Sequence, residues 1–489
     1  MTKTRDLADL GGGFIPAGTG AVQRTVESKL QDVVSVKDFI PAGINTSTTD
    51  CTSYVQAAVT ASAGKTLLID GTYLIEGAIT ISSSCNITGK GELVFNNVTG
   101  VSLVITTNDV IIHGITIRGN SPGGVQIKSG ASRITIDSVT FKDIGQCVWL
   151  YDCSQVRVAG CHFRDTLNYC VIQQLGYVSN YGEVSGCVFQ NCGGDAIELN
   201  CATVASYGWI ITGNRFLGSA GFPTGATEKR FVGVTNVTYV TITDNYIQNA
   251  AGDAAIHLED VGGEVIVANN NIVDCLGAAG AGIIYVLNSA QNVLIANNNI
   301  QMTNPALPAQ VAISMASGLY TNKSIISGNR IAAKNGATLD GIDLSSQSSG
   351  ATVSGNNFVS LGTGIIVTEC GYLTAVGNEF DGCAVGIADV ISVSSGSLTD
   401  SVIEANMFVN STGDNMNLNR NSNGTKGPKR ILIAGNKFDR NVVINDADDC
   451  FATNNQIKAT YSITFGTVHV GPVRCSLVNT HVIGTGLVP

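Results

Sequence analysis

A six-residue phrase that recurs along the chain constrains its fold more than any other feature of the sequence. The phrase consists of an aliphatic residue, two small or polar residues, an asparagine, a variable residue and then Phe or Ile. Its asparagines lie 19 to 31 residues apart, and a self-similar period of this size is the signature of a repeat architecture. Ten copies begin at Ile211, Ile242, Val267, Ile295, Ile326, Val353, Ala375, Ile403, Ile433 and Ala452. Four looser copies, which extend the count to fourteen, carry Ile115, Val139, Cys161 and Cys187 at the asparagine position.

A second phrase lies between the copies of the first. It is a small residue followed by alternating apolar positions, as in AIEL from Ala196 and GIDL from Gly341, and such alternation is typical of a half-buried strand. The period lacks the 3.6-residue apolar rhythm of helical repeats and is shorter than a propeller blade. We therefore predict an all-β fold, a single-stranded parallel β-helix of about fourteen rungs between about Thr66 and Lys458.

The recurring asparagine has a structural explanation. Equivalent residues on successive rungs of a β-helix lie about 4.8 Å apart, so that an inward-turning amide can bond to the copies above and below it. Cys161 and Cys187 share this position, and their state, stacked thiols or a disulfide, stays open. The 14 cysteines and five histidines lack the spacing of a zinc site. We expect neither a metal nor a cofactor.

The charge of the chain limits its partners. With 27 basic and 37 acidic residues the formal net charge is −10, which disfavours binding of nucleic acid and favours a neutral or mixed-charge ligand. The polar N-terminus lacks the apolar core of a signal peptide, and no apolar run is long enough to span a membrane. We expect a soluble protein made in a cytoplasm, with no membrane insertion.

Both ends of a β-helix expose unpaired backbone and need caps. Between Asp50 and Ala63 the sequence predicts a short covering helix with Thr52 or Ser53 as its N-cap. After Ile457 the phrase stops, and short strands separated by glycines follow. We predict an N-terminal segment over 1–45, the cap and β-helix over 46–458, and a C-terminal β segment over 459–489 that packs against copies of itself.

The N-terminal run GAVQRTVESKLQDVVSVKDFIPAG, Gly20 to Gly43, resembles the segment that precedes the β-helix in tailspikes of tailed bacteriophages, within the pectate-lyase-like superfamily. The specific match covers about 25 residues, and the next stretch, Ile40 to Asp50, departs from the usual Gly-rich junction of that family. The resemblance implies right-handed coils, a homotrimer on the virion, and attachment to a phage tail or baseplate protein through the N-terminus. It also implies binding, and often cleavage, of the capsule or O-antigen of a host bacterium.

Hydrolysis of a glycosidic bond needs two carboxyl groups, about 5–5.5 Å apart for retention and about 6.5–9.5 Å apart for inversion. Aligning the second phrase places outward side chains in one column, and the acidic groups gather near its middle. The column contains Trp149, Ile172, Glu198, Gly233, His257, Tyr285, Ser314, Asp343 and Ile366. The candidate catalytic residues are Glu198, Asp195, Asp253, His257 and Asp343.

Each of these residues also has a purely structural explanation. Asp195, Asp253 and Asp340 precede strands and are suited to Asx turns, whereas Glu198 and Asp343 could be solvated surface groups. A long irregular insertion, Cys201 to Arg230, favours a catalytic role for these acidic residues, because binding residues concentrate on such loops. Aromatic rings with a polar edge suit sugars. The candidate substrate-binding residues are Trp149, Tyr207, Trp209, Arg230 and Tyr285.

The leading hypothesis is therefore an endo-glycoside hydrolase that depolymerises bacterial surface polysaccharide. A polysaccharide lyase would instead need a Lys, Arg, His or Tyr base acting on a uronic acid. A non-catalytic adhesin is the third alternative. The sequence does not identify the glycan, the host, or whether the site lies within one subunit or between subunits.

Overall fold

The computed structural model describes residues 13–14, 24–25, 31–96, 103–119, 123–201, 205–218, 230–250, 252, 254–277, 281–288, 292–316, 324–345, 350–368, 370–389, 398–419, 427–445, 447–458, 460–466 and 474–483. The chain divides into two compact units, an N-terminal unit over 1–167 and a C-terminal unit over 168–489. Each unit is described by itself.

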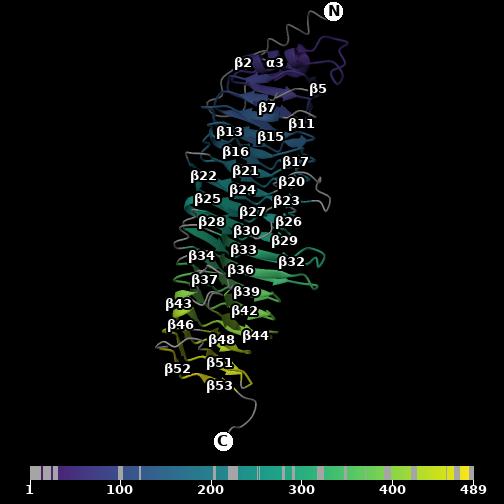
Figure 1. Cartoon of the computed structure of the whole chain (residues 1–489). Helices are drawn as coiled ribbons and strands as arrows, with labels where there is room; N and C mark the ends of the chain where they lie inside the picture. The colour runs from purple at the N-terminus through teal and green to yellow at the C-terminus, as the bar shows by residue number, and fades with distance from the viewer. Residues whose placement is uncertain are drawn as a thin grey trace, which may run out of the picture. The chain divides into compact units, whose positions relative to one another are not determined.

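The C-terminal unit is built from one coil of three short strands, repeated so that equivalent strands pair in parallel and form three sheets (Figure 1). Sheet 1 consists of β19 (Glu183–Ser185), β22 (Ser206–Thr212), β25 (Val237–Thr243), β28 (Gly262–Ala268), β31 (Val293–Ala296), β34 (Ile325–Ser327), β37 (Thr352–Ser354), β40 (Thr374–Val376), β43 (Thr399–Glu404), β46 (Lys429–Ala434), β49 (Phe451–Thr453) and β52 (Ser476–Val478). Sheet 2 consists of β20 (Val188–Gln190), β23 (Arg215–Leu217), β26 (Tyr246–Gln248), β29 (Asn271–Val273), β32 (Asn299–Met302), β35 (Arg330–Ala333), β38 (Asn357–Val359), β41 (Glu379–Asp381), β44 (Met407–Val409), β47 (Lys437–Phe438), β50 (Gln456–Lys458) and β53 (His481–Ile483). Sheet 3 consists of β18 (Val171–Gln173), β21 (Ile197–Asn200), β24 (Val232–Thr235), β27 (Ile256–Glu259), β30 (Gly282–Leu287), β33 (Gln310–Ala316), β36 (Leu339–Ser345), β39 (Thr363–Thr368), β42 (Val385–Asp389), β45 (Met416–Leu418), β48 (Val442–Asn445) and β51 (Ile463–Gly466). This architecture confirms the predicted parallel β-helix.

The recurring asparagine forms a buried ladder at the corner between sheets 1 and 2. The backbone N–H and the side-chain Nδ2 of Asn214 both donate to Oδ1 of Asn245 at 3.0 Å, and Nδ2 also donates to a carbonyl oxygen of the preceding coil. The same pattern continues to Asn455. Cys187 donates its backbone N–H to Oδ1 of Asn214, which confirms that it occupies the ladder position. The ladder gives each buried amide its partners.

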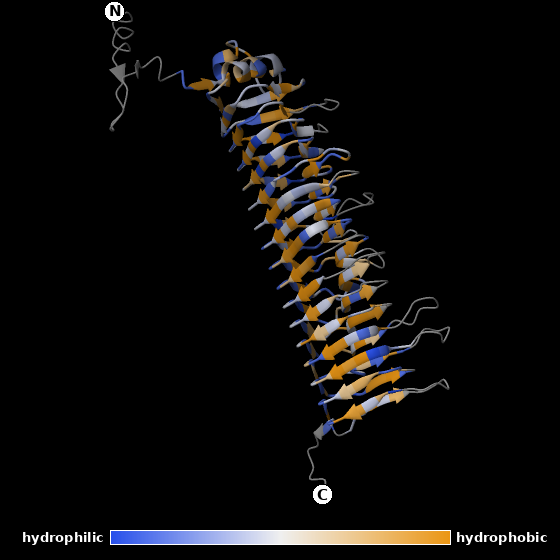
Figure 2. Cartoon of the chain, turned by 90° about the vertical axis from the view of Figure 1, so that its left-hand side faces the viewer, coloured by the Kyte–Doolittle hydropathy of each residue, from blue (hydrophilic) through white to orange (hydrophobic). Residues whose placement is uncertain are grey.

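The interior of each coil is filled by the inward side chains of alternating positions, and most strands carry hydrophobic segments in Figure 2. Aromatic residues of the phrase stack across successive coils in sheet 2. The rings of Phe358 and Phe380 lie 4.8 Å apart, and those of Phe380 and Phe408 lie 4.6 Å apart. Stacked identical side chains follow from the exact repeat of the coil along its axis.

The N-terminal unit repeats the same coil. Its strands are β3 (Val33–Ser35), β4 (Thr66–Ile69), β7 (Cys85–Gly89), β10 (Val110–His113), β13 (Ser132–Asp137) and β16 (Ser154–Ala159) in one sheet; β5 (Thr72–Ile75), β8 (Glu92–Phe95), β11 (Thr116–Arg118), β14 (Thr140–Lys142) and β17 (His162–Arg164) in a second; and β6 (Ile79–Ile81), β9 (Leu103–Ile105), β12 (Gly123–Ile127) and β15 (Gln146–Leu150) in a third. A two-stranded antiparallel pair, β1 (Gly13–Phe14) and β2 (Arg24–Thr25), precedes them.

The predicted covering helix is α3 (Thr52–Ala61), which buries Val55, Ala58 and Val59. Its N-cap is Cys51, one residue before the predicted position. The carboxylate of Asp50 accepts the backbone N–H of Thr52 at 2.9 Å and thereby satisfies a donor of the first turn. The start of the coil lies earlier than predicted, because β3 pairs in parallel with β4 and the 3₁₀ helix η1 (Val36–Phe39) follows it.

The C-terminal segment adds one more coil. Strands β51, β52 and β53 pair in parallel with β48, β49 and β50. The strands predicted after Ile457 therefore exist and continue all three sheets. Within the part of the chain that the structure describes, no helix is long and apolar enough to cross a membrane.

Candidate active site

The predicted column of outward side chains exists in sheet 3. Strand register pairs its members in an unbroken series across the sheet, and this confirms the alignment of the second phrase. The paired residues are, in order, Ile172, Glu198, Gly233, His257, Tyr285, Ser314, Asp343 and Ile366.

The column is recessed at its centre. Glu198, Tyr285 and Asp343 are half-buried, whereas His257 is 3% exposed and Ser314 is fully buried. The position of Ser314 in the column was predicted, but no role was assigned to it because serine carries little signal at a single site. The side chains available to a ligand are therefore separated by buried ones.

Gly233 is the place where the acidic groups meet. A Cβ atom at this glycine would lie 3.1 Å from Oδ2 of Asp195 and 3.5 Å from Cδ of Arg230, so both side chains extend over the gap that the glycine leaves. Glu198 is the register partner of Gly233 on the preceding strand. Because neighbouring strands are about 4.8 Å apart, Oδ2 of Asp195 lies within about 8 Å of the Cβ of Glu198. The Asp195 carboxylate and the Arg230 side chain thus lie over Gly233, beside the strand position of Glu198.

The local contacts explain how these groups are held. Oδ1 of Asp195 accepts the backbone N–H of Arg230 at 2.7 Å, so Asp195 bonds to the next coil rather than closing an Asx turn. Glu198 accepts a hydrogen bond at 3.3 Å from Nδ2 of Asn200, two residues along the same strand face. Asn200 was not among the predicted site residues, although its spacing from Glu198 placed it on the same face.

His257 lies on the far side of the same glycine. Burial, and then the positive charge of Arg230, lowers the pKa of His257 to about 3, so the ring is neutral at physiological pH. The ring stacks on Tyr285 with centroids 5.3 Å apart, and neither ring nitrogen has a hydrogen-bond partner among the residues that the structure describes. A buried polar atom without a partner calls for a water molecule or a ligand group.

Tyr285 continues the site toward the next coil. Burial, and then the charge of Glu259, raises the pKa of Tyr285 above its usual value, so its hydroxyl stays protonated. Glu259 accepts a hydrogen bond from Nδ2 of Asn288 at 3.0 Å. The half-buried phenol ring and its neutral hydroxyl present an apolar face with a polar edge.

Asp343 does not belong to this cluster. Five strand steps separate it from Glu198, about 24 Å at the usual strand spacing. Two carboxyl groups at that distance cannot act on one glycosidic bond. Asp343 therefore cannot act as the partner of Glu198 on one glycosidic bond. The nearby Asp340 accepts the backbone N–H of Thr363 of the next coil, and burial raises its pKa.

Two predicted binding residues lie elsewhere. Most of the described part of the predicted insertion forms regular strands. Tyr207 and Trp209 lie on one of them, β22 of sheet 1. Trp209 is 1% exposed, its Nε1 donates to the carbonyl oxygen of Ser179, and its ring fills the space that Gly182 leaves. Its assignment as a sugar-binding residue is wrong, because the indole is part of the core. Tyr207 is 39% exposed.

Trp149 and Asp253 are the remaining predicted residues. Trp149 lies on β15 in the N-terminal unit, where its ring contacts Tyr151. Asp253 lies outside the described residues, as do residues 202–204 and 219–229 of the predicted insertion. The structure therefore brings together Asp195, Glu198, Arg230, His257 and Tyr285.

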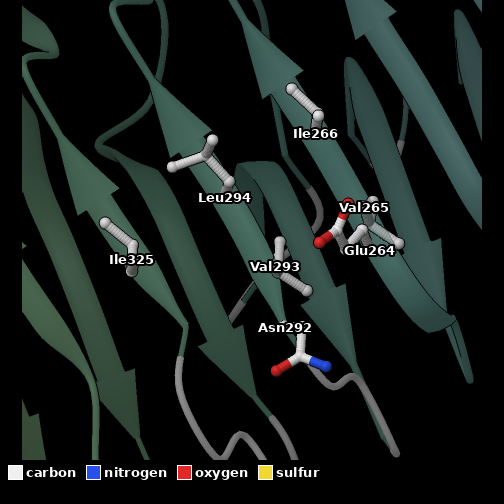
Figure 3. A pocket seen from close by; sticks show the side chains of 7 residues that line it. All are labelled: Glu264, Val265, Ile266, Asn292, Val293, Leu294 and Ile325. Atoms are coloured by element: carbon white, nitrogen blue, oxygen red, sulfur yellow. The ribbon is translucent and has the colours of Figure 1, made fainter.

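A shallow groove of about 400 Å³ lies on sheet 1 and is shown in Figure 3. It is mainly aliphatic and contains no group suited to acid–base chemistry except one carboxylate. Its lining residues are Glu264, Val265, Ile266, Asn292, Val293, Leu294 and Ile325. Among the described residues, no group of three or more His, Cys, Asp or Glu side chains is arranged to hold a metal ion.

The fold is that of a parallel β-helix protein, in which a buried Asp195 and a half-buried Glu198 lie near each other at sheet 3. A family model described as a right-handed β-helix region matches residues 62–222, 175–358 and 230–397. These matches cover more than half of the chain, which therefore belongs to the right-handed β-helix family.

Solved structures of similar fold come from an enzyme and from two viruses. The DFA-IIIase of Arthrobacter chlorophenolicus A6, in complex with GF2, is 13% identical, with a TM-score of 0.51 over 68% of this chain and 95% of the other. Tailspike protein 3 of bacteriophage CBA120 is 14% identical, with a TM-score of 0.42 over 98% and 67%. A tailspike protein variant of E. coli bacteriophage HK620, in complex with a pentasaccharide, is 15% identical, with a TM-score of 0.43 over 93% and 82%. No curated protein sequence matches the chain.

Proposed function

We propose that the chain is a bacteriophage tailspike that binds a polysaccharide of the bacterial surface, capsule or O-antigen, and cleaves it by endo-glycoside hydrolysis. The observation that carries the hydrolysis is the convergence of Asp195 and Glu198 at Gly233. The origin from a phage rests on the resemblance of Gly20 to Gly43 to the segment that precedes the β-helix in tailspikes.

The two carboxyl groups have different surroundings, which suits them to different roles. Asp195 is buried, accepts the backbone N–H of Arg230 and lies beside the Arg230 side chain, whereas Glu198 is half-buried. Asp195 would attack the anomeric carbon or activate a water, while Glu198 protonates the leaving glycosidic oxygen.

The other members of the cluster support hydrolysis over elimination. A lyase needs a base that takes a proton from the sugar ring. His257 has a pKa of about 3 and is a weak base, and Tyr285 keeps its proton because its pKa is raised. Both side chains suit binding instead, Tyr285 through its ring face and His257 as a neutral hydrogen-bonding group.

The assembly completes the proposal. The N-terminal segment 1–45 attaches the protein to a tail or baseplate protein of the virion, and three copies of the chain form a homotrimer with contacts through 459–489. The formal net charge of −10 disfavours nucleic acid and strongly acidic polymers as ligands. Sedimentation of the full chain should give the mass of three chains.

The test of hydrolysis uses purified protein and capsule and O-antigen preparations from a panel of bacteria. Polymer size is followed by size-exclusion chromatography, together with the ultraviolet absorbance of a new C=C bond. We expect one polymer to shorten without a gain in absorbance. Asp195→Asn and Glu198→Gln should each lower the rate by about 10²–10⁴-fold, the usual contribution of a positioned acid or base.

Asp343→Asn is the matched control, because this carboxyl lies in the same column but far from the pair. It should leave the rate within about threefold of wild type, since a single change at that distance from the pair seldom does more. Full activity of both Asp195→Asn and Glu198→Gln would refute the assignment. A rise in absorbance would identify a lyase, and binding without shortening would identify an adhesin.

A further inference from the structure

One edge of sheet 1 presents residues with left-handed backbone on successive coils. Gly208 and Tyr239 lie between register-paired residues of β22 and β25, and Tyr181 precedes β19 on the coil before them. Their φ angles are 78°, 57° and 56°, and Gly263 on the following coil has 67°. Tyrosine and glycine thus alternate along this edge.

The tyrosine rings use the space that the glycines leave. A Cβ atom at Gly208 would lie 2.8 Å from the ring of Tyr181, and one at Gly263 would lie 3.2 Å from the ring of Tyr239. Each ring therefore leans over the glycine of the next coil. Tyr207, beside Gly208, meets the ring of Tyr181 edge to face with centroids 5.0 Å apart.

The three rings remain open to solvent. Tyr181 is 56% exposed, Tyr207 is 39% exposed and Tyr239 is 58% exposed. They come from three successive coils and so span about 10 Å along the sheet. Rings this exposed contribute little to the core, so stability of the coil does not account for them.

The backbone at these positions also does not account for tyrosine. A left-handed conformation costs a bulky residue of order 1–3 kcal/mol, and Asn, Asp and Gly adopt it more easily. Other left-handed positions of the same sheet carry Asp400 at 51° and Asp449 at 53°, and also Arg430 at 52° and Tyr372 at 58°. Tyr181 and Tyr239 adopt the less favourable conformation and expose their rings.

We propose that Tyr181, Tyr207 and Tyr239 form a carbohydrate-binding platform, a second site on sheet 1 that is separate from the carboxylates of sheet 3. Pyranose rings would stack their C–H faces on the phenol rings. Their hydroxyl groups would meet the polar side chains beside these rings, which are Asn180, Thr238 and Glu264. These neighbours provide acceptors and include no cation, so the ligand is an uncharged stretch of glycan.

The platform lies around a tight corner from the proposed cleavage site. Strand β24 of sheet 3 ends at Thr235 and β25 of sheet 1 begins at Val237, so Tyr239 follows the end of β24 by four residues. One long polymer can therefore contact both faces. The role of the platform in anchoring the cleaved polymer rests on the proposed function. Binding of carbohydrate by the platform does not depend on it.

The test measures binding of the full chain to the capsular polysaccharides and O-chains of the same bacterial panel, immobilised for interferometry. Glu198→Gln is included in every protein so that the polymer stays intact. The double variant Tyr181→Ala/Tyr239→Ala should weaken polymer binding about tenfold, equivalent to about 1.4 kcal/mol. Tyr181→Phe/Tyr239→Phe keeps the ring faces and should bind within about twofold of the parent.

Tyr372→Ala is the matched control, because Tyr372 has the same left-handed backbone, with φ 58°, and is 64% exposed on the same sheet. It should leave polymer binding unchanged. Thermal unfolding of each variant checks that the fold is kept.

Unchanged binding by the double alanine variant would overturn the platform, and so would an equal loss in the phenylalanine variant. Binding to no polymer of the panel would overturn it as well. A wild-type chain that binds a polymer without shortening it contradicts the proposed hydrolysis, while the same variants still decide the platform.

Discussion

Gly233 decides how closely the two carboxyl groups of sheet 3 approach each other. Any larger residue there would occupy the space into which Asp195 and Arg230 extend. The chemistry therefore depends on the absence of a side chain, which no list of reactive residues reveals.

Gly233→Ala tests this dependence. The new Cβ would lie 3.1 Å from Oδ2 of Asp195, closer than nearly all real contacts, so the carboxylate must shift. We expect the rate of polymer shortening to fall by about 10²-fold, as misplacement of a catalytic group by about 1 Å does. The control is Gly371→Ala, where the nearest atom lies at 3.5 Å. Equal rates for both variants would show that the gap at Gly233 is not needed.

His257 provides a prediction about pH. With a folded-state pKa of about 3 and an ordinary value of about 6.5 in the unfolded chain, the unfolded chain binds more protons between these two pH values. The contribution of His257 to stability is therefore complete above about pH 6.5 and declines as the pH falls toward 3.

The measurement is NMR of the five histidines, labelled with ¹³C at Cε1, between pH 8 and pH 4.5. One signal should not titrate, and His257→Asn should remove that signal. A His257 signal that moves with a midpoint near pH 6.5 would contradict the burial argument.

At the scale of elements, the asparagine ladder joins every coil of the C-terminal unit from Asn214 onward to the next. Each amide uses both its donor and its acceptor capacity in the interior, and a break leaves buried groups without partners. The ladder is therefore a series of equivalent bonds whose loss is felt locally.

Asn329→Ala should lower the free energy of unfolding by about 2–5 kcal/mol, because it leaves the backbone N–H and the Nδ2 of Asn298 without their shared acceptor. Denaturant titration followed by circular dichroism measures this loss. Asn304→Ala, at an exposed turn, should change it by less than about 0.5 kcal/mol. Similar losses for the two variants would mean that the ladder is not a special source of stability.

At the scale of the whole molecule, the formal net charge of −10 sets how binding responds to salt. A polyanion would be repelled, and its binding would strengthen as salt screens the repulsion. The binding of a neutral glycan through ring faces and hydrogen bonds involves no such charge repulsion, so salt should affect it little.

We expect the dissociation constant for the cleaved polymer to change less than about twofold between 0.05 and 0.5 M NaCl, since ion release contributes nothing to this contact. Interferometry on the Glu198→Gln protein gives this value. An affinity that falls steeply with salt would show that Arg230 and other cations hold an acidic polymer. It would contradict the prediction that the bound polymer is neutral.

The sequence by itself determined the coil, the ladder and the column of sheet 3. All three follow from short repeats, and a repeat that stacks on itself places equal residues at equal positions. The alignment that paired Glu198, Gly233, His257 and Tyr285 needed no knowledge of the loops. The covering helix α3 was also predicted, to within a residue of its N-cap.

Only the tertiary structure decided which side chains meet. The carboxylate of Asp195 and the side chain of Arg230 come to Gly233 from segments outside the strands. The burial of the Trp209 indole depends on the space that Gly182 of the preceding coil leaves. The burial of the His257 ring depends on the side chains that pack around it. Alternation along a strand predicts on which face a side chain lies, but burial on the outer face is set by neighbours from other coils, and no repeat encodes them.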